Sequence, residues 1–118
     1  MPAKLLEAQV RQQPGAIVID LHGEIDAAAA PALNAAYAEA EQSNPEVILL
    51  NFGAVDYINS TGIALIVGLL AKARAAHRRL IVCGLSEHYV EIFRITRLAD
   101  FMTMFPNEAS ALAGAGSH

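Results

Sequence analysis

VILLNFGAVDYINSTGIALIVGLL, the stretch from Val47 to Leu70, holds three successive patterns that decide the fold. Val47–Leu50 is a short and wholly apolar run, which is typical of a strand that is buried on both faces. Asn51–Ser60 contains glycine, aspartate and asparagine, which predicts a loop. From Thr61 onward, apolar residues recur at spacings of three and four, which predicts a helix. The stretch therefore predicts a buried strand that leads through a loop into a helix.

Three small polar residues, Asn59, Ser60 and Thr61, stand where the predicted helix begins. The first backbone N–H groups of a helix lack partners and lie at the positive end of its dipole, so this position favours a phosphate or another anion. All three residue types are also common helix caps, and capping accounts for one of them. It leaves two unexplained beside Gly62, and a small, open helix start suits docking or covalent modification.

Outward from this stretch, strand and helix patterns alternate along the chain. Gln13-Pro14-Gly15 predicts a turn that joins the first two strands as an antiparallel hairpin. We interpret His22–Asp26 as a polar loop that follows the second strand. Pro31 must lie in the first turn of the next helix, so that helix begins between Ala27 and Ala30.

The run from Val47 to Cys83 reads as strand, helix and strand, which fits a parallel pair. Gly84 ends the second of these strands, and Ser86 is the expected N-cap of the helix that follows. Positions 113–118 are expected to be frayed. The expected strands are Lys4–Gln12, Ala16–Leu21, Val47–Asn51, Leu80–Cys83 and Met102–Phe105, and the expected helices are Ala27–Gln42, Thr61–His77, Glu87–Ile95 and Asn107–Leu112.

Composition restricts the class of protein. The 118 residues fit one domain, and 54% apolar against 17% charged residues predicts a packed core. A net charge of −4 argues against nucleic-acid binding. The longest apolar run, Ile63–Ala71, is far shorter than the roughly 20 residues of a membrane span. The N-terminus lacks signal-peptide features, and the lone Cys83 suits a reducing compartment, so we expect a cytoplasmic protein without direct membrane insertion.

Other polar residues show no pattern of an active site. Glu24 and Asp26 could serve as an acid–base pair or bind Mg²⁺, but no third ligand accompanies them, which favours a solvated loop. The histidines lack metal-ligand spacing, and Cys83 ends an apolar strand, where a buried thiol is the default. No phosphate-binding glycine motif or nucleophile elbow is present. The sequence therefore predicts no catalytic residue, no metal, no cofactor and no enzymatic activity.

The chain resembles the STAS domains, which are named for sulfate transporters and anti-sigma-factor antagonists. Gly23–Asp26 is similar to the family's strand-to-helix loop, and Asp56–Gly62 is similar to its signature, which usually ends Asp-Ser-Ser-Gly. The order of elements also agrees from Lys4 to Pro106. The resemblance implies an α/β fold with a mixed sheet, an N-terminal hairpin, parallel strands and helices mainly on one face. It assigns residues 1–106 to the domain and 107–118 to a short helix or a frayed tail.

The resemblance also implies a function, that of an anti-sigma-factor antagonist. In bacterial antagonists the second hydroxyl residue of the signature is phosphorylated, which corresponds to Thr61, with Ser60 as second choice. The implied partners are an anti-sigma factor with kinase activity, which binds the unphosphorylated antagonist, and a serine/threonine phosphatase. The implied partner-binding residues are Glu24, Asp26, Tyr57, Asn59, Ser60, Thr61 and Gly62.

Two departures from the family pattern and two alternative functions accompany this interpretation. Asn59 replaces the usual Asp and removes a charge, and Thr61 replaces the usual Ser and adds a methyl group.

Small STAS proteins also resemble the soluble subunit of bacterial lipid-transport ABC transporters. A scaffold domain in a stress-sensing assembly is the other alternative. Both would bind their partners constitutively, without a phosphorylation switch.

Overall fold

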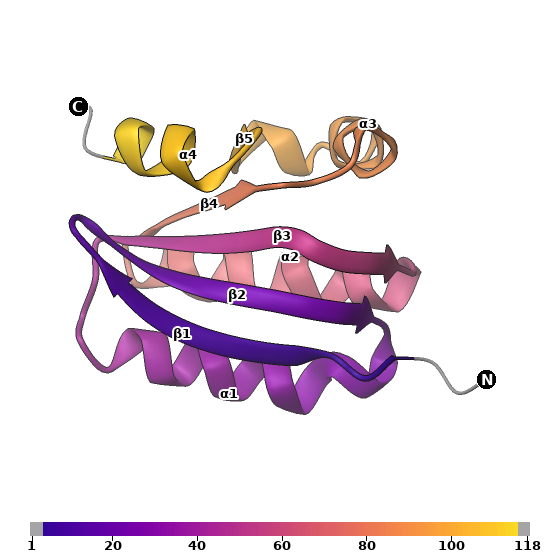
Figure 1. The fold of residues 1–118 in the computed structure, drawn as a ribbon, viewed down its shortest axis with the longest axis horizontal. Coiled ribbons are helices and arrows are strands. Elements are labelled where there is room, and N and C mark those ends of the chain that lie inside the picture. The colour runs from indigo at the N-terminus through magenta and orange to yellow at the C-terminus, as the bar shows by residue number, and fades with distance from the viewer. Residues whose placement is uncertain (1–3, 116–118) are drawn as a thin grey trace.

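The computed structural model describes residues 4–115, which form one five-stranded sheet with four helices and two 3₁₀ turns (Figure 1). The strands are β1 (Glu7–Gln13), β2 (Ala16–Ile25), β3 (Val47–Ile58), β4 (Arg79–Cys83) and β5 (Thr103–Phe105). The helices are α1 (Ala30–Glu41), α2 (Ser60–Ala75), α3 (Glu87–Ile95) and α4 (Glu108–Ala115), and the 3₁₀ turns are η1 (Ala27–Ala29) and η2 (Leu98–Asp100).

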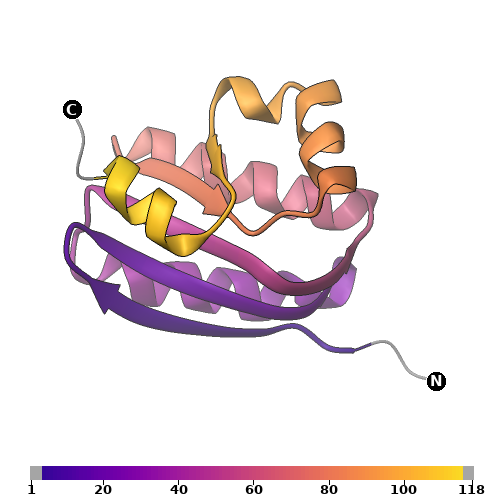
Figure 2. The same ribbon diagram turned by 45° about the horizontal axis from the view of Figure 1, so that its top comes forward.

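The strands lie in the sheet in the order in which they occur in the chain. β1 and β2 pair antiparallel, which confirms the predicted hairpin, and the pairs from β2 to β5 are all parallel. Connections between parallel strands are almost always right-handed. Because each connection here leads to the adjacent strand in the same direction, the connecting helices lie on the same face of the sheet. α1 and α2 cover that face, and α4 lies in front of the opposite face (Figure 2). The mixed sheet with helices mainly on one face is as predicted.

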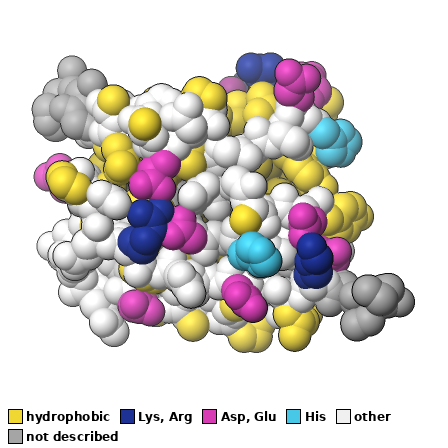
Figure 3. All heavy atoms as spheres, in the orientation of Figure 1, with side chains coloured by type: hydrophobic (Ala, Val, Ile, Leu, Met, Phe, Trp, Pro, Cys, Tyr) yellow, Lys and Arg dark blue, Asp and Glu magenta, His cyan; other side chains and the backbone are white. Residues whose placement is uncertain are grey.

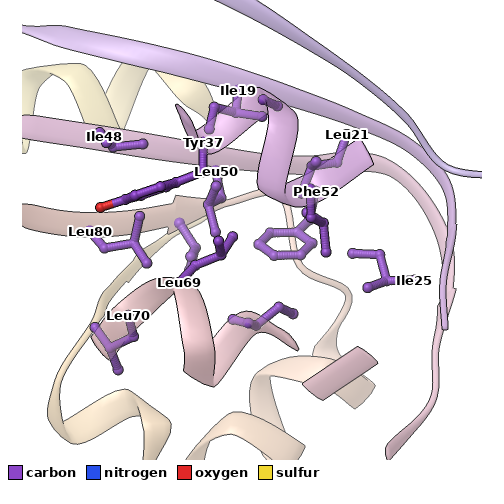
Figure 4. Packing of buried hydrophobic residues seen from close by; sticks show 14 of the residues in the cluster. Ile19, Leu21, Ile25, Tyr37, Ile48, Leu50, Phe52, Leu69, Leu70 and Leu80 are labelled. Atoms are coloured by element: carbon purple, nitrogen blue, oxygen red, sulfur yellow. The ribbon is translucent and has the colours of Figure 1, made fainter. Parts of the chain in front are cut away.

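The core has two layers because the central strands are buried on both faces. Ile48 and Leu50 of β3 pack toward α1 and α2, in the cluster that Figure 4 shows. Val47 and Leu49 point the other way and join a smaller cluster under α4. This confirms the prediction that Val47–Leu50 is a strand buried on both faces. Each such side chain contributes about 1.5–3 kcal/mol through burial.

Both central strands are longer than the sequence predicts. The predicted loops His22–Asp26 and Asn51–Ser60 are wrong over most of their length, because β2 continues to Ile25 and β3 to Ile58. The two strands stay paired to their last residues, through register shifts that absorb the local irregularities. Pairing between the strands gives the backbone N–H and C=O groups their hydrogen-bond partners. This gain outweighs the preference of the glycine, aspartate and asparagine residues for turns.

The helices begin close to the predicted positions. Pro31 lies in the first turn of α1, as predicted, and the preceding residues Ala27–Ala29 form the η1 turn. α2 begins at Ser60, one residue earlier than predicted, and ends at Ala75, before the predicted end at His77. The side chain of Ser86 accepts a hydrogen bond from a backbone N–H of α3, which confirms it as the N-cap.

The C-terminal segment forms a packed helix. The predicted short helix is confirmed, and it continues through positions 113–115, so the expectation of fraying is wrong there; positions 116–118 lie outside the described residues. A Cβ atom on Gly114 would stand 2.5 Å from the ring of Phe105. α4 therefore packs directly on the Phe105 ring, and a side chain at position 114 would require that ring to move.

A polar network links α4 to the sheet. The guanidinium of Arg11 forms ion pairs with Asp20 and with Glu108, the latter from Nη2 to Oε1 at 2.6 Å. Asn51 donates from Nδ2 to Oδ1 of Asp20 at 2.9 Å, and the thiol of Cys83 lies 3.6 Å from Oδ1 of Asn51. Burial raises the pKa of Cys83 to about 11, so its thiol stays protonated and unreactive near neutral pH.

We predict that Asp20 makes stability depend on pH below about 4. Its hydrogen bonds from Arg11 lower the pKa of Asp20 below its ordinary value of 3.8. As pH falls through that value, the unfolded chain takes up a proton that the folded chain does not, so stability falls until the folded carboxylate is protonated too. Urea unfolding between pH 2.5 and 6 should show a steeper loss for the wild type than for Asp20→Asn.

The matched control for this experiment is Asp56→Asn. Asp56 pairs with Lys4 at 3.2 Å, but both side chains are at least half exposed. Ion pairs at the surface contribute about 0–1 kcal/mol, so this substitution should change stability little at any pH. Parallel pH profiles of the wild type and Asp20→Asn would contradict the prediction.

Candidate functional site

The candidate site lies at one end of the sheet, where β2 and β3 finish side by side (Figure 1). Their last residues are paired, with Glu24 opposite Tyr57 and Ile25 opposite Ile58. Binding sites of α/β folds gather outside the carboxyl ends of parallel strands. The structure brings the residues predicted from the sequence to this end: Glu24 and Asp26 from β2 and its exit, Tyr57 from β3, and Asn59, Ser60, Thr61 and Gly62 from the start of α2.

Asn59 alone caps α2. Its side-chain Oδ1 accepts a hydrogen bond from the N–H of Gly62 at 2.8 Å, and its carbonyl oxygen accepts one from Ile63 at 2.9 Å. Ser60 and Thr61 therefore occupy the first turn without a capping role, and both are exposed. Neither hydroxyl forms a hydrogen bond with any residue in the range 4–115. The cap thus accounts for one of the three polar residues, and two hydroxyls remain available to a partner.

Gly62 fixes the helix against the end of β2. The N–H of Asn59 donates to the carbonyl oxygen of Ile25 at 3.2 Å. A Cβ atom on Gly62 would overlap that oxygen and lie 2.8 Å from the carbonyl carbon. The first turn of α2 can approach the strand this closely only because residue 62 has no side chain. The position of both hydroxyls is therefore set by backbone contacts.

Tyr89 of α3 supports the end of β3, and no pattern in the sequence indicates this role. Its hydroxyl oxygen accepts a hydrogen bond from the backbone N–H of Ile58 at 2.9 Å, one residue before the cap. Its ring also makes an edge contact with His88 at 4.9 Å between centroids. The two bonded residues are 31 positions apart, so no local pattern could have indicated this contact.

Asp26 and Glu24 occupy different elements at this end of the sheet. The carboxylate of Asp26 caps η1 by accepting from the N–H of Ala28 at 3.0 Å, which confirms the interpretation that it serves a helix start. Glu24 lies in β2 beside Tyr57, a residue that is 51% exposed. Among residues 4–115, no three acidic, histidine or cysteine side chains are placed to hold a metal ion.

The start of α2 favours an added anion. The first N–H groups of α2, those of Ser60 and Thr61, point out of the helix at the positive end of its dipole. No acidic residue lies in this first turn. On the face that Figure 3 shows, basic side chains stand beside acidic ones. A phosphate on either hydroxyl would meet the free N–H groups of its own helix.

Comparisons with known proteins bear on the family and the fold. A model of the STAS domain matches residues 7–111. The anti-sigma-B factor antagonist of Listeria monocytogenes is 33% identical over 86 residues, which cover 73% of this chain and 75% of that protein. An anti-sigma factor antagonist from Mycobacterium paratuberculosis has a similar crystal structure, with a TM-score of 0.82 at 21% identity over 95% of each chain.

A second solved structure extends the likeness. The Bacillus cell fate determinant SpoIIAA, in its phosphorylated form, has a TM-score of 0.68 at 25% identity and covers 90% of this chain and 96% of its own. The fold predicted from the sequence is thereby confirmed. Within residues 4–115, no helix has the length and apolar character needed to cross a membrane.

We predict that Gly62→Ala and Gly68→Ala will change stability in opposite directions. The methyl group at position 62 would collide with the backbone of Ile25, and relieving such overpacking costs about 1–3 kcal/mol. Gly68 lies in the same helix with open space around it, so alanine there should stabilise by about 0.8–1 kcal/mol. Urea unfolding measures both. Equal effects of the two substitutions would contradict the close approach of α2 to β2.

We predict that Asn59→Asp will keep the stability of the chain and that Asn59→Ala will lose about 1 kcal/mol. Aspartate can accept the same hydrogen bond from Gly62 and adds a negative charge at the positive end of the dipole. Alanine leaves the N–H of Gly62 without its partner. Thermal unfolding followed by circular dichroism tests the pair, and an unchanged Asn59→Ala would show that the cap is dispensable.

Proposed function

Since this chain belongs to the STAS domain family, we propose that it is an anti-sigma factor antagonist that is switched off by phosphorylation at the start of α2. The observation that carries the proposal is the exposed pair of hydroxyls on Ser60 and Thr61, which Asn59 leaves free by capping the helix itself. The relatives named as antagonists and the phosphorylated form of a similar structure support it.

The unphosphorylated chain offers a compact binding surface. Tyr57 provides a half-exposed aromatic ring, and aromatic residues are common anchors of interfaces. Beside it, Ser60 and Thr61 present small polar groups against which a partner can pack closely. The proposed partner is an anti-sigma factor with kinase activity, and a serine/threonine phosphatase would restore the unmodified state. Both partners serve the control of transcription, so the proposal locates the chain in the cytoplasm.

Thr61 is the proposed phosphorylation site, and Ser60 is the second choice. The Oγ1 atom of Thr61 would bond to the γ-phosphorus of ATP held by the kinase, while ADP leaves and the hydroxyl proton passes to a base of the kinase. The phosphate adds about −1.5 to −2 charges at neutral pH. The helix N-terminus accommodates that charge, but a partner packed on the hydroxyl meets new bulk and desolvation. A loss of about 3 kcal/mol weakens binding more than a hundredfold.

We predict that Thr61→Val will prevent phosphorylation and retain partner binding. Valine keeps the shape of threonine and removes the acceptor hydroxyl. Thr61→Glu should weaken binding to the kinase-type anti-sigma factor by about a hundredfold or more, because it places a charge at the contact. Intact mass and peptide mapping after incubation with that kinase and ATP measure the modification, and calorimetry measures the dissociation constant.

Ser60→Ala is the matched control, since it removes the neighbouring hydroxyl from the same exposed turn. It should leave both the modification and the binding unchanged. A phosphate that maps to Ser60 would keep the switch and correct the residue. If the wild type binds its partner but accepts no phosphate, the switch is wrong. The constitutive alternatives, a subunit of a lipid-transport ABC transporter or a stress-sensing scaffold, would then replace it.

A further inference from the structure

An apolar groove of about 520 Å³ opens between the C-terminal half of α2 and the segment around η2. Val67, Leu70 and Arg74 line it from α2, at spacings of three and four that place them on one stripe of the helix. Leu98 and Phe101 line it from the η2 side. Val67 is 43% exposed and Phe101 is 54% exposed. Large apolar side chains that gather in an open groove are typical of a binding surface.

The rim of this groove is cationic, although the chain carries a net charge of −4. The guanidinium of Arg74 lies 5.0 Å from the ring centroid of Phe101 and forms no ion pair with any residue in the range 4–115. Arg97 also lines the groove, and its Nε donates to Oδ2 of Asp100 at 2.6 Å. The groove therefore combines an apolar floor with an uncompensated guanidinium, which favours an apolar segment flanked by carboxylates.

We propose that this groove binds an acidic amphipathic helix of another protein. The wall from Val67 to Arg74 spans roughly 10 Å, which is two turns of a helix. A helix that lies in a groove anchors through apolar residues at such spacings, and acidic residues beside them would reach Arg74. A second copy of the chain fits less well, because no acidic residue lines the groove and the neighbouring Asp100 already pairs with Arg97. Two facing grooves would therefore offer Arg74 no free carboxylate.

The groove binds its partner independently of the phosphorylation switch, and in this the inference goes beyond the proposed function. Thr61 and Arg74 lie roughly 20 Å apart along α2. The Debye length is about 8 Å at physiological ionic strength, so a phosphate on Thr61 hardly changes the potential at Arg74. The acidic helix therefore holds the chain in both of its states, while the switched partner binds only one.

Site-specific photo-cross-linking in the cells from which the chain comes tests the inference. The full chain carries p-benzoylphenylalanine in place of Phe101, which keeps an aromatic ring beside Arg74. After irradiation, mass spectrometry maps the cross-linked peptide. We expect a peptide of another protein with apolar residues at helical spacing and flanking Asp or Glu. Arg74→Glu should lower the yield about tenfold or more, because it turns the attraction into repulsion.

Lys72→Glu is the matched control, because it makes the same change of charge two residues away, where the side chain points to Asn34 at 3.4 Å. It should retain the cross-link, and Thr61→Glu should retain it within about twofold. A cross-link to a second copy, to a basic or non-helical peptide, or to nothing at all would overturn the inference. A cross-link lost in Thr61→Glu would do so as well, since the groove would then belong to the switched interface.

Discussion

The close approach of the first turn of α2 to the carbonyl of Ile25 is the contact on which the site depends. A helix start can lie on a strand end at this distance only if the facing residue has no side chain, and Gly62 meets that condition. Asn59 completes the junction: its backbone N–H donates to the carbonyl oxygen of Ile25, and its side chain caps α2 by accepting from the N–H of Gly62. The hydroxyls that follow are held by backbone geometry rather than by their own hydrogen bonds, so they stay available for chemistry.

The same helix presents different surfaces at its two ends. Its N-terminal turn is small and polar, with free N–H groups that suit a transferred phosphoryl group. Its C-terminal half is apolar and carries Arg74 over the ring of Phe101. Between them, Ile66 and Leu69 are buried in the main core and anchor the helix to the sheet. One helix can therefore serve a switched contact and a constant contact, because its length exceeds the distance over which charges act in salt solution.

Much of this arrangement follows from local patterns in the sequence. The apolar run Val47–Leu50 indicates a strand buried on both faces, and the turn at Pro14-Gly15 indicates the hairpin. The three polar residues before Gly62 indicate the helix start at which the candidate site lies. The predicted loops were wrong where β2 and β3 pair beyond their apolar segments. Local residue propensity does not take into account the hydrogen bonds that a segment forms with a neighbouring strand. Tyr89 was missed for the same reason, because its bond to Ile58 joins segments 31 residues apart.

The sequence by itself determined the order of strands and helices, the two-sided core and the position of the hydroxyls at a helix start, because each depends on neighbours within a few residues. Only the tertiary structure decided which polar residue caps the helix and which hydroxyls remain free. It also decided that Asp26 serves η1 and that α4 packs on the second face of the sheet. The packing of α4 joins segments that are far apart in the chain, and it arises only when the sheet has formed. The two caps join residues two or three positions apart, but which residue becomes the cap depends on where the paired strands β2 and β3 end.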